Sequence, residues 1–490
     1  MSVAVFNQCS FNQWPWHHWA TCSPEKQALC LYDNETSGET FSWQQLAIKI
    51  DTLADCFRQQ GVAENSSVIL RGKNSADLLL CYLAALQCGA RVLPLNPQLP
   101  DALLVELLPH LNMAFVADFT GSPSAAIQAT KLNWQSEPIT TAMPDQQAGK
   151  PAAWDVNRPA SMVLTSGSSG LPKAVVHSIG AHLASAQGVL SCMDFQPDDR
   201  WLLSLPLFHV SGQGILWRWL LRGAELALQD MSSLDDALSG CTHASLVPTQ
   251  LWRWLFRSRE HRSCEQRSRE HPPTLKNVLL GGAMIPPELI QQAEQSGIRC
   301  WCGYGLTEMA STVCAKRADG LSGVGKPLPG KAIRLVKDEI QIRADSIALG
   351  YWFDGKLQPL TGENGWFPTR DRGDFQQGEL CVLGRLDNQF FSGGEGVQPE
   401  DIERIINQHP QIQQSFVIPI PDIEFGHRPV AVIETDNPQL TETLADWLAD
   451  KLAGFQRPVA CYLLPEHLKH GGIKTSRQQV RQWVLAQYVN

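Results

Sequence analysis

The sequence has no run of eighteen or more apolar residues, and its first twenty residues lack both a basic segment and an apolar core. We therefore expect neither a membrane span nor a secretory signal. A basic excess is also missing, because 40 Lys and Arg stand against 49 Asp and Glu, a net charge of −9. Nucleic-acid-binding proteins usually carry the opposite sign, so we expect no nucleic-acid partner.

The 14 cysteines show no paired spacing of the kind that binds zinc or builds a disulfide framework. Together with the missing secretory signal, this predicts reduced thiols and a cytoplasmic protein. Cys300 and Cys302 form a single CxC pair, which we interpret as part of a buried strand. A metal site at this pair is the weaker alternative.

The composition indicates large folded cores, since 43% of the 490 residues are hydrophobic and 18% are charged. Apolar strand patterns alternate with helical ones, for example a strand over 67–71, a helix over 76–87 and a strand over 90–95. The same alternation recurs with a strand over 277–280 and a helix over 286–295. This pattern predicts an α/β fold, with a large N-terminal domain of layered α/β subdomains and mostly parallel sheets.

The last hundred residues have a pattern of their own. Helices are expected over 399–407 and 439–453, and strands over 414–419 and 429–434. We therefore expect domains at 1–386 and 387–490, the second a small, mobile α+β lid. The segments 120–158 and 257–271, where RSREH occurs twice, are interpreted as surface insertions without an assigned role.

A loop rich in small and hydroxylated residues follows the apolar stretch at 161–164. Its backbone can approach an anion closely, and its hydroxyl and N–H groups can donate to phosphate oxygens. A flexible linker is the alternative, and the GxxxxGK[ST] pattern of the Walker A loop is absent there. The residues in question are Thr165, Ser166, Gly167, Ser168, Ser169, Gly170 and Lys173.

Three further stretches carry groups suited to a nucleotide. Thr307 and Glu308 offer a hydroxyl for phosphate and a carboxylate for Mg²⁺, although a simple turn into a helix explains them equally well. Asp371 can accept both hydroxyls of a ribose, with a surface turn as the alternative. Lys474, near the C-terminus, is on its own an ordinary solvated lysine.

Taken in this order, with the stretches 384–387 and 392–396 between them, these motifs resemble the adenylate-forming superfamily of acyl-CoA synthetases, adenylation domains and luciferases. The resemblance runs from Phe41 to Lys474 and therefore covers nearly the whole chain. It implies an enzyme that joins a carboxylic acid to AMP, using ATP and Mg²⁺, and then passes the acyl group to CoA.

The resemblance also implies individual roles. The 165–173 loop would close on the β- and γ-phosphates, Thr307 would contact the α-phosphate, and Glu308 would hold Mg²⁺. Lys474 would be the mobile catalytic lysine and Asp387 the hinge. The adenosine would be bound by Gly281, Gly282 and Ala283 beside the base, by Tyr304 stacked on it, and by Asp371 with Arg385 at the ribose.

The stretches 205–214 and 470–477 resemble the acid–CoA ligases whose acid is an aromatic keto-dicarboxylate. Such an acid needs an apolar slot and a fixed cation, for which we select Arg218, although a surface arginine between core tryptophans is the alternative. Ser211 and Gln213 are further candidate contacts. His209 matches the substrate-tunnel gate of the family, with a histidine packed beside Phe208 as the alternative.

Three other functions remain open at this point. The chain could activate another aromatic or fatty acid, or it could load a carrier protein instead of CoA. A nucleotide-binding protein without catalysis is disfavoured by the presence of both Glu308 and Lys474. Phe390 and Phe391 precede Ser392 where the family often has a lysine, which weakens any assignment of a CoA phosphate contact there. A homo-oligomer is compatible with the sequence.

Overall fold

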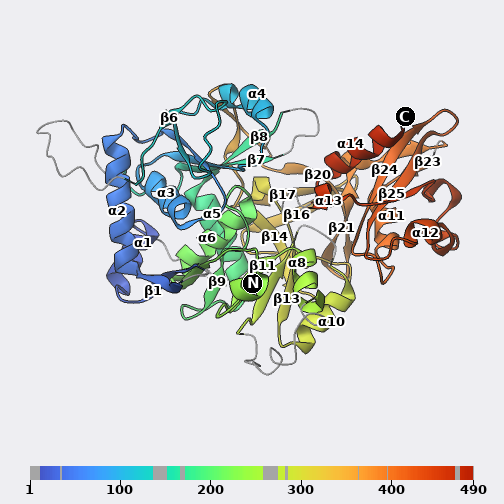
Figure 1. Cartoon of the computed structure of the whole chain (residues 1–490), viewed down its shortest axis with the longest axis horizontal. Helices are drawn as coiled ribbons and strands as arrows, with labels where there is room; N and C mark the ends of the chain where they lie inside the picture. The colour runs from blue at the N-terminus through green and yellow to red at the C-terminus, as the bar shows by residue number, and fades with distance from the viewer. Residues whose placement is uncertain are drawn as a thin grey trace, which may run out of the picture.

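The computed structural model describes residues 11–33, 36–135, 152–165, 171–257, 274–281, 285–361, 364–393, 395–469 and 475–488. Within these residues the chain forms four β-sheets, with helices packed between and around them (Figure 1). Among the described helices, none combines the length and the apolar character needed to cross a lipid bilayer. The α/β fold expected from the sequence is confirmed.

The first sheet has eight strands in the order β19-β18-β8-β7-β4-β3-β5-β6 within the described residues. Its strands from β7 to β6 run parallel, whereas β7, β8, β18 and β19 pair in antiparallel fashion. The bounds are β3 (Ser67–Arg71), β4 (Arg91–Leu95), β5 (Phe115–Asp118), β6 (Thr130–Lys131), β7 (Pro159–Thr165), β8 (Lys173–Ser178), β18 (Gly350–Phe353) and β19 (Lys356–Gln358).

The second sheet has nine strands in the described part of the chain, in the order β15-β14-β13-β12-β11-β9-β10-β1-β2. The six strands from β13 to β1 are parallel, and antiparallel strands close both edges. The bounds are β1 (Gln27–Asp33), β2 (Thr36–Ser42), β9 (Arg200–Leu202), β10 (Glu225–Leu228), β11 (His243–Leu246), β12 (Asn277–Leu280), β13 (Arg299–Leu306), β14 (Ser311–Arg317) and β15 (Lys326–Pro327).

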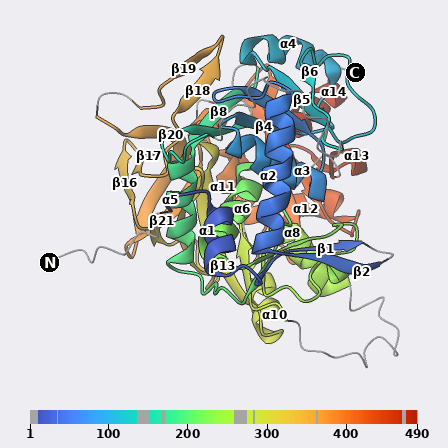
Figure 2. The same ribbon diagram turned by 90° about the vertical axis from the view of Figure 1, so that its left-hand side faces the viewer.

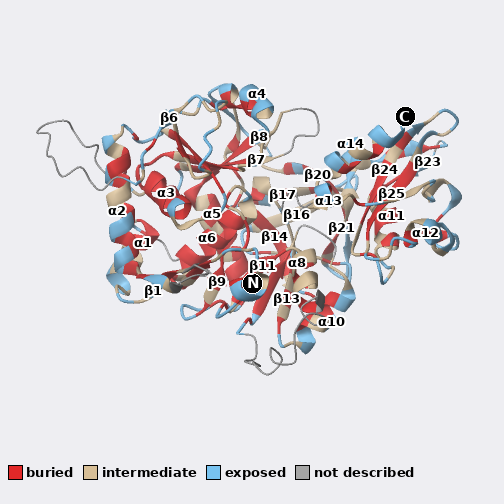
Figure 3. Ribbon diagram, viewed as in Figure 1, coloured by how far each residue is buried: buried red, intermediate tan, exposed pale blue. Residues whose placement is uncertain are grey.

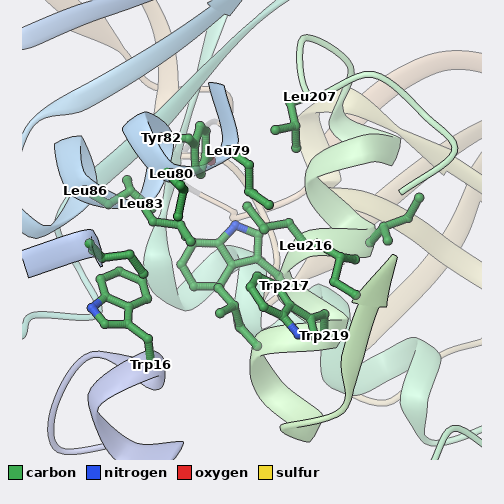
Figure 4. Close-up of a cluster of buried hydrophobic side chains, with 14 of the residues drawn as sticks. Trp16, Leu79, Leu80, Tyr82, Leu83, Leu86, Leu207, Leu216, Trp217 and Trp219 are labelled. Atoms are coloured by element: carbon green, nitrogen blue, oxygen red, sulfur yellow. The ribbon is translucent and has the colours of Figure 1, made fainter. Parts of the chain in front are cut away.

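Helices α3, α5 and α6 supply much of the core of this large region, and buried residues concentrate on them and on the strands (Figure 3). Trp217 and Trp219 of α6 pack near Leu79 and Tyr82 of α3 (Figure 4), which fixes α6 against the rest of the core. Helix α2 lies on the outside, as Figure 2 shows. The bounds are α1 (Pro15–Cys22), α2 (Trp43–Gln59), α3 (Ala76–Gln87), α4 (Asp101–Leu111), α5 (Ile179–Leu190), α6 (Val210–Arg222), α7 (Leu234–Ala237), α8 (Pro248–Trp252), η1 (Arg253–Arg257) and α10 (Pro287–Gln295).

A smaller antiparallel sheet connects the two large sheets to the C-terminal residues. It consists of β16 (Lys331–Val336), β17 (Glu339–Ala344), β20 (Phe367–Gln376) and β21 (Glu379–Arg385). Strand β21 ends where a single turn, η3 (Leu386–Asn388), begins. Asp387 therefore lies in the short link between this sheet and the residues that follow.

The C-terminal residues form a compact unit at the right of Figure 1. Its sheet has an apolar cluster on each face, one packed against α11 and α12 and the other against α14. The helix expected over 439–453 is shorter, because backbone turns follow Leu448. The bounds are β22 (Phe390–Ser392), β23 (Glu395–Val397), α11 (Pro399–Ile406), β24 (Gln414–Asp422), β25 (Gly426–Glu434), α12 (Leu440–Leu448), η4 (Gly454–Gln456), β26 (Cys461–Leu463), α13 (Glu466–Lys469) and α14 (Arg477–Tyr488).

Several local predictions are confirmed closely. The expected strand at 67–71 and helix at 76–87 are β3 and α3, and the strand at 277–280 is β12. Cys300 and Cys302 are buried in β13, as the CxC pattern predicted. The domain boundary at 386/387 and the mobility of the lid stay predictions.

Candidate active site

The ends of the serine-rich loop are fixed by a β-hairpin. Thr165 ends β7 and Lys173 begins β8, and the two residues face each other across the antiparallel pair. The Lys173 ammonium lies 4.9 Å from the centre of the Tyr351 ring, on the neighbouring strand β18. The loop therefore starts and ends at adjacent ends of two interior strands of the first sheet, and Lys173 at its end lies beside Tyr351.

Tyr351 also contacts the second predicted motif. Its hydroxyl donates a hydrogen bond of 2.8 Å to Oε1 of Glu308, and the Ala348 amide donates to the Glu308 carbonyl at 2.8 Å. Burial, followed by the neighbouring Glu308 carboxylate, raises the pKa of Tyr351 and keeps the phenol protonated as a donor. Tyr351 thus brings the lysine of the loop and the carboxylate of Glu308 into one site.

The turn that carries Thr307 and Glu308 is unusually tight. It is the single turn η2 (Thr307–Met309) between β13 and β14, and it is followed by Ala310 and Ser311 at φ +51° and +106°. A β-carbon at Gly305 would lie 2.2 Å from the Ser311 carbonyl oxygen, so only glycine fits there. Non-glycine residues in the left-handed region cost free energy and often mark functional sites.

His177 supports this turn from β8. Its Nε2 lies 2.7 Å from the Thr307 carbonyl oxygen, so Nε2 carries the hydrogen and donates it. The imidazole is fully buried, and burial lowers the pKa of His177 to about 4, which makes it neutral near pH 7. A neutral histidine from the first sheet therefore holds the backbone of a turn that extends from the second.

The predicted ribose-binding group is held by three neighbours. The Tyr304 hydroxyl donates to Oδ2 of Asp371 at 2.5 Å, and Arg385 donates to Oδ1 at 3.1 Å. Thr369 Oγ1 accepts the Asp371 amide at 3.0 Å. Burial, together with the Asp371 carboxylate, raises the pKa of Tyr304, so the phenol stays a donor. Gly281 lies at the end of β12, with open space where a side chain would begin.

Asp387 accepts hydrogen bonds from two arginines, at 2.8 Å from Arg370 and 3.3 Å from Arg385. Burial opposes ionisation of this carboxyl, but the hydrogen bonds and charges of the two guanidinium groups outweigh it and lower its pKa. Arg385 therefore connects the predicted ribose ligand Asp371 to the predicted hinge residue.

The residues predicted to bind the acid lie on α6 or directly before it. Arg218 is 1% exposed, so the alternative of a surface arginine is wrong. Its nearest polar partner is Ser245 Oγ at 3.5 Å from Nη1, its Nε has no partner among the described residues, and its guanidinium lies 5.3 Å from the Trp201 ring centre. Burial lowers the pKa of Arg218 to about 10. The group is therefore a charged, largely unsatisfied donor inside the protein.

The other candidates around α6 differ in their surroundings. His209 is exposed at the N-terminus of the helix, and its ring meets Phe208 edge-on with centroids 4.8 Å apart. Gln213 is buried and donates to the Leu207 carbonyl at 3.0 Å, which fixes the loop before the helix. Ser211 is half-buried in the first turn.

Some predicted site residues lie outside the described residues, and their roles stay predictions. They are Ser166, Gly167, Ser168, Ser169, Gly170, Gly282, Ala283 and Lys474. Tyr351 and His177, in contrast, belong to the site but were not predicted from the sequence. No local signal identifies either residue, because each acts through a strand pairing or a hydrogen bond that spans more than 40 residues of sequence.

Comparison with known proteins agrees with this geometry. The profile of the AMP-binding enzyme family matches residues 16–352, which is more than half of the chain. The chain belongs to this family. The profile of the AMP-binding enzyme C-terminal domain matches residues 401–472, within the compact C-terminal unit.

Similar individual proteins cover almost the full length of the chain. A 2-succinylbenzoate–CoA ligase from Salmonella typhimurium is 54% identical, over 97% of this chain and 98% of the relative. The enzyme of the same name from Escherichia coli is 52% identical, over 97% and 99%. The solved structure of an E. coli MenE variant with bound OSB-AMS superposes with a TM-score of 0.87 at 51% identity, covering 98% and 99% of the two chains.

Proposed function

We propose that the chain is an ATP-dependent 2-succinylbenzoate–CoA ligase. It converts 2-succinylbenzoate and ATP to an acyl-adenylate and pyrophosphate, and then forms o-succinylbenzoyl-CoA and AMP with CoA. We assign this reaction to menaquinone biosynthesis. The observation that carries the proposal is the buried Arg218, which has no acidic partner among the described residues, in a chain that shares about half its residues with ligases of this name.

In the first step a substrate carboxylate attacks the α-phosphorus of ATP. Little covalent chemistry is required of the protein, which must position the reactants and stabilise the negative charge. The serine-rich loop and Lys173 would hold the β- and γ-phosphates, and Thr307 would contact the α-phosphate. Asp371 would accept the ribose hydroxyls, because Arg385 and Tyr304 already orient its carboxylate.

The residues present fit a magnesium ion at Glu308. Its carboxylate is a hard oxygen ligand, and no basic side chain of the described residues forms an ion pair with it. When bound, Mg²⁺ supplies positive charge for the leaving pyrophosphate. Tyr351 orients the carboxylate through the hydrogen bond to Oε1.

In the second step the thiol of CoA attacks the acyl carbonyl. Lys474 would bridge the attacking carboxylate and the α-phosphate in the first step, and it would have to leave before a thiol can approach. We infer that the C-terminal unit turns about Asp387 between the steps, and that His209 gates the thiol path. Closure of the C-terminal unit over the site would also protect the reactive adenylate from water.

A mass-spectrometric assay with ATP, Mg²⁺, CoA and one acid tests the proposal. We expect o-succinylbenzoyl-CoA from 2-succinylbenzoate, at a kcat/KM well above that for benzoate or a long-chain fatty acid. Faster turnover of either of those acids would assign the chain to another branch of the family. If the acyl-adenylate forms but CoA alone never accepts the acyl group, the chain loads a carrier protein instead.

A cytoplasmic location is part of the same proposal. It is supported by the cysteines of the described residues, which are all free thiols.

A further inference from the structure

We propose that Lys331 is a specificity-determining residue, which binds together with Arg218 the carboxylate of 2-succinylbenzoate that is not adenylated. This inference rests on the proposed function and deepens it, because it assigns a second cation to the acid pocket. A simple acid has only one carboxylate, and that carboxylate is consumed when it is adenylated, so a single cation would suffice. A dicarboxylate brings a second negative charge into the protein interior, where it needs partners.

Lys331 is the first residue of β16, and its side chain turns inward toward the helices. A β-carbon at Gly188 of α5 would lie 2.8 Å from Nζ of Lys331. A β-carbon at Gly214 of α6 would lie 3.1 Å from Nη2 of Arg218 and 3.3 Å from Oγ of Ser311. Two glycines on neighbouring helices therefore leave the space into which the two cations extend.

The two cations share their surroundings, and neither has a counter-ion among the described residues. Each interacts electrostatically with the other and with the thiol of Cys192. No acidic side chain of the described residues forms an ion pair with either group, and Asp345, the carboxylate that influences Lys331, is exposed. Uncompensated buried charge is costly, so the arrangement favours a ligand that brings negative charge.

The other titratable groups around Lys331 do not supply that charge. Burial raises the pKa of Cys192, and it raises the pKa of Cys314 to about 12, so both thiols are neutral. Burial lowers the pKa of Lys331 itself to about 8. The lysine is thus mostly protonated at pH 7, and it loses its charge within an accessible pH range.

The position of Ser311 connects this pair to the reaction. Ser311 follows the η2 turn, in which Thr307 is expected to contact the α-phosphate, and its hydroxyl and Nη2 of Arg218 both border the space next to Gly214 of α6. A dicarboxylate held by Arg218 and Lys331 would therefore have its anchored end near the start of β14, the strand that follows the turn carrying Thr307. The spacing between anchor and phosphate would then select the length of the acid.

The test compares Lys331→Met with wild type on two acids. The first is 2-succinylbenzoate, and the second is 4-oxo-4-phenylbutanoate, which lacks the aromatic carboxylate. We expect the KM for 2-succinylbenzoate to rise about 30-fold in Lys331→Met, since one partner of a buried charge pair is lost. The KM for ATP, and kcat/KM for 4-oxo-4-phenylbutanoate, should change less than about threefold.

Two further variants complete the design. Lys337→Met removes an exposed lysine from the turn at the end of the same strand and should behave as wild type. Lys331→Arg keeps the charge and should retain most of the preference for the dicarboxylate. Equal losses with both acids or a parallel rise in the KM for ATP would reduce Lys331 to a structural role, and an unchanged KM for 2-succinylbenzoate would remove it from the pocket.

The pH profile gives an independent readout. kcat/KM reports the protonation of the free enzyme, so the ratio of kcat/KM for the two acids should fall as pH rises through about 8. Taking the ratio cancels groups that both reactions share, and Lys331→Arg should abolish the fall. A ratio independent of pH in wild type contradicts the inference. Absence of any thioester from 2-succinylbenzoate in wild type would instead overturn the proposed function.

Discussion

The arginines on the nucleotide side of the site and the arginine on the acid side differ in whether an acidic residue is paired with them. On the nucleotide side Arg385 and Arg370 are already paired with Asp371 and Asp387. On the acid side Arg218 has no acidic partner among the described residues, and it is almost fully buried. A ribose brings neutral hydroxyls and needs an oriented acceptor, whereas an organic anion needs a charge that no protein group has yet neutralised.

This difference between paired and unpaired arginines separates charges that stabilise the fold from charges that serve ligand binding. Paired and hydrogen-bonded charges can add to the stability of the fold, whereas a buried unpaired charge opposes folding and is compensated only when a ligand binds. Substitutions at the two ends should therefore have opposite effects on stability, although both should reduce activity.

The largest effect is expected for Arg218→Met. Loss of a buried charge that faces a substrate anion should lower kcat/KM for 2-succinylbenzoate by about 100-fold or more, since such contacts contribute about 2–5 kcal/mol. The KM for ATP should stay within about threefold of wild type. Because an unpaired buried charge is removed, the thermal midpoint should be unchanged or higher. Steady-state kinetics and a thermal melt test both points, and a clearly lower midpoint would show that Arg218 stabilises the fold after all.

Asp371→Asn should show the reverse pattern. It leaves Tyr304 and Arg385 without their charged acceptor, so we expect about 1–3 kcal/mol less stability and a KM for ATP raised about 10- to 100-fold. The KM for 2-succinylbenzoate should change little. Urea denaturation measures the loss of stability, and ATP titrations measure the KM. The control is Asp374→Asn, which changes an exposed carboxylate in the same strand. An Asp371→Asn protein as stable as wild type would remove the contrast between the two ends.

Buried neutral histidines connect the two ends and should make stability depend on pH. The pKa of His177 falls from an ordinary 6.5 to about 4, so the unfolded chain binds a proton between these values that the folded chain does not. Stability is therefore fully present above about 6.5 and decreases as pH falls toward 4. We expect a loss of about 1.4 kcal/mol per pH unit for each such histidine.

His182 contributes in the same direction, because burial, followed by the neighbouring His177, lowers its pKa well below 6.5. Its ring stacks on Trp217, the residue before Arg218, with centroids 5.2 Å apart. Urea unfolding between pH 6.5 and 5.5 should show a shallower slope in His177→Gln than in wild type. His467→Gln, at an exposed position in α13, should keep the wild-type slope, and equal slopes in all three proteins would contradict a buried neutral His177.

These contrasts also show what could be predicted from the sequence. The strand at 67–71 and the helix at 76–87 were predictable because each is set by local apolar spacing and flanking residues. Thr307, Glu308 and Asp371 could be proposed as ligands because their residue types suit a nucleotide. Their hydrogen-bond partners could not, because Tyr351 reaches Glu308 only through the pairing of β18 with β8.

The burial of individual side chains was the other property that the local sequence pattern did not determine. From the sequence alone, Arg218 could equally have been a surface arginine. Only the packing of α6 inside the core removes it from solvent (Figures 3 and 4). Lys331 follows Pro329 and Gly330, a context typical of an exposed turn, yet it turns toward Gly188 of α5. In both cases the decisive contact joins elements that are distant in sequence.

The smallest effect is expected for Arg370→Ala, which tests how much the paired side depends on each charge. Asp387 would still be held by Arg385, and Arg370 is an exposed side chain whose ion pair is screened by water. The adenylation rate and the thioester-forming rate should both stay within about twofold of wild type. Single-turnover measurements of each half-reaction separate them. A selective loss of thioester formation would mean that Arg370, and not Arg385 alone, sets the position of Asp387, and the nucleotide side would then be less redundant than its two arginines indicate.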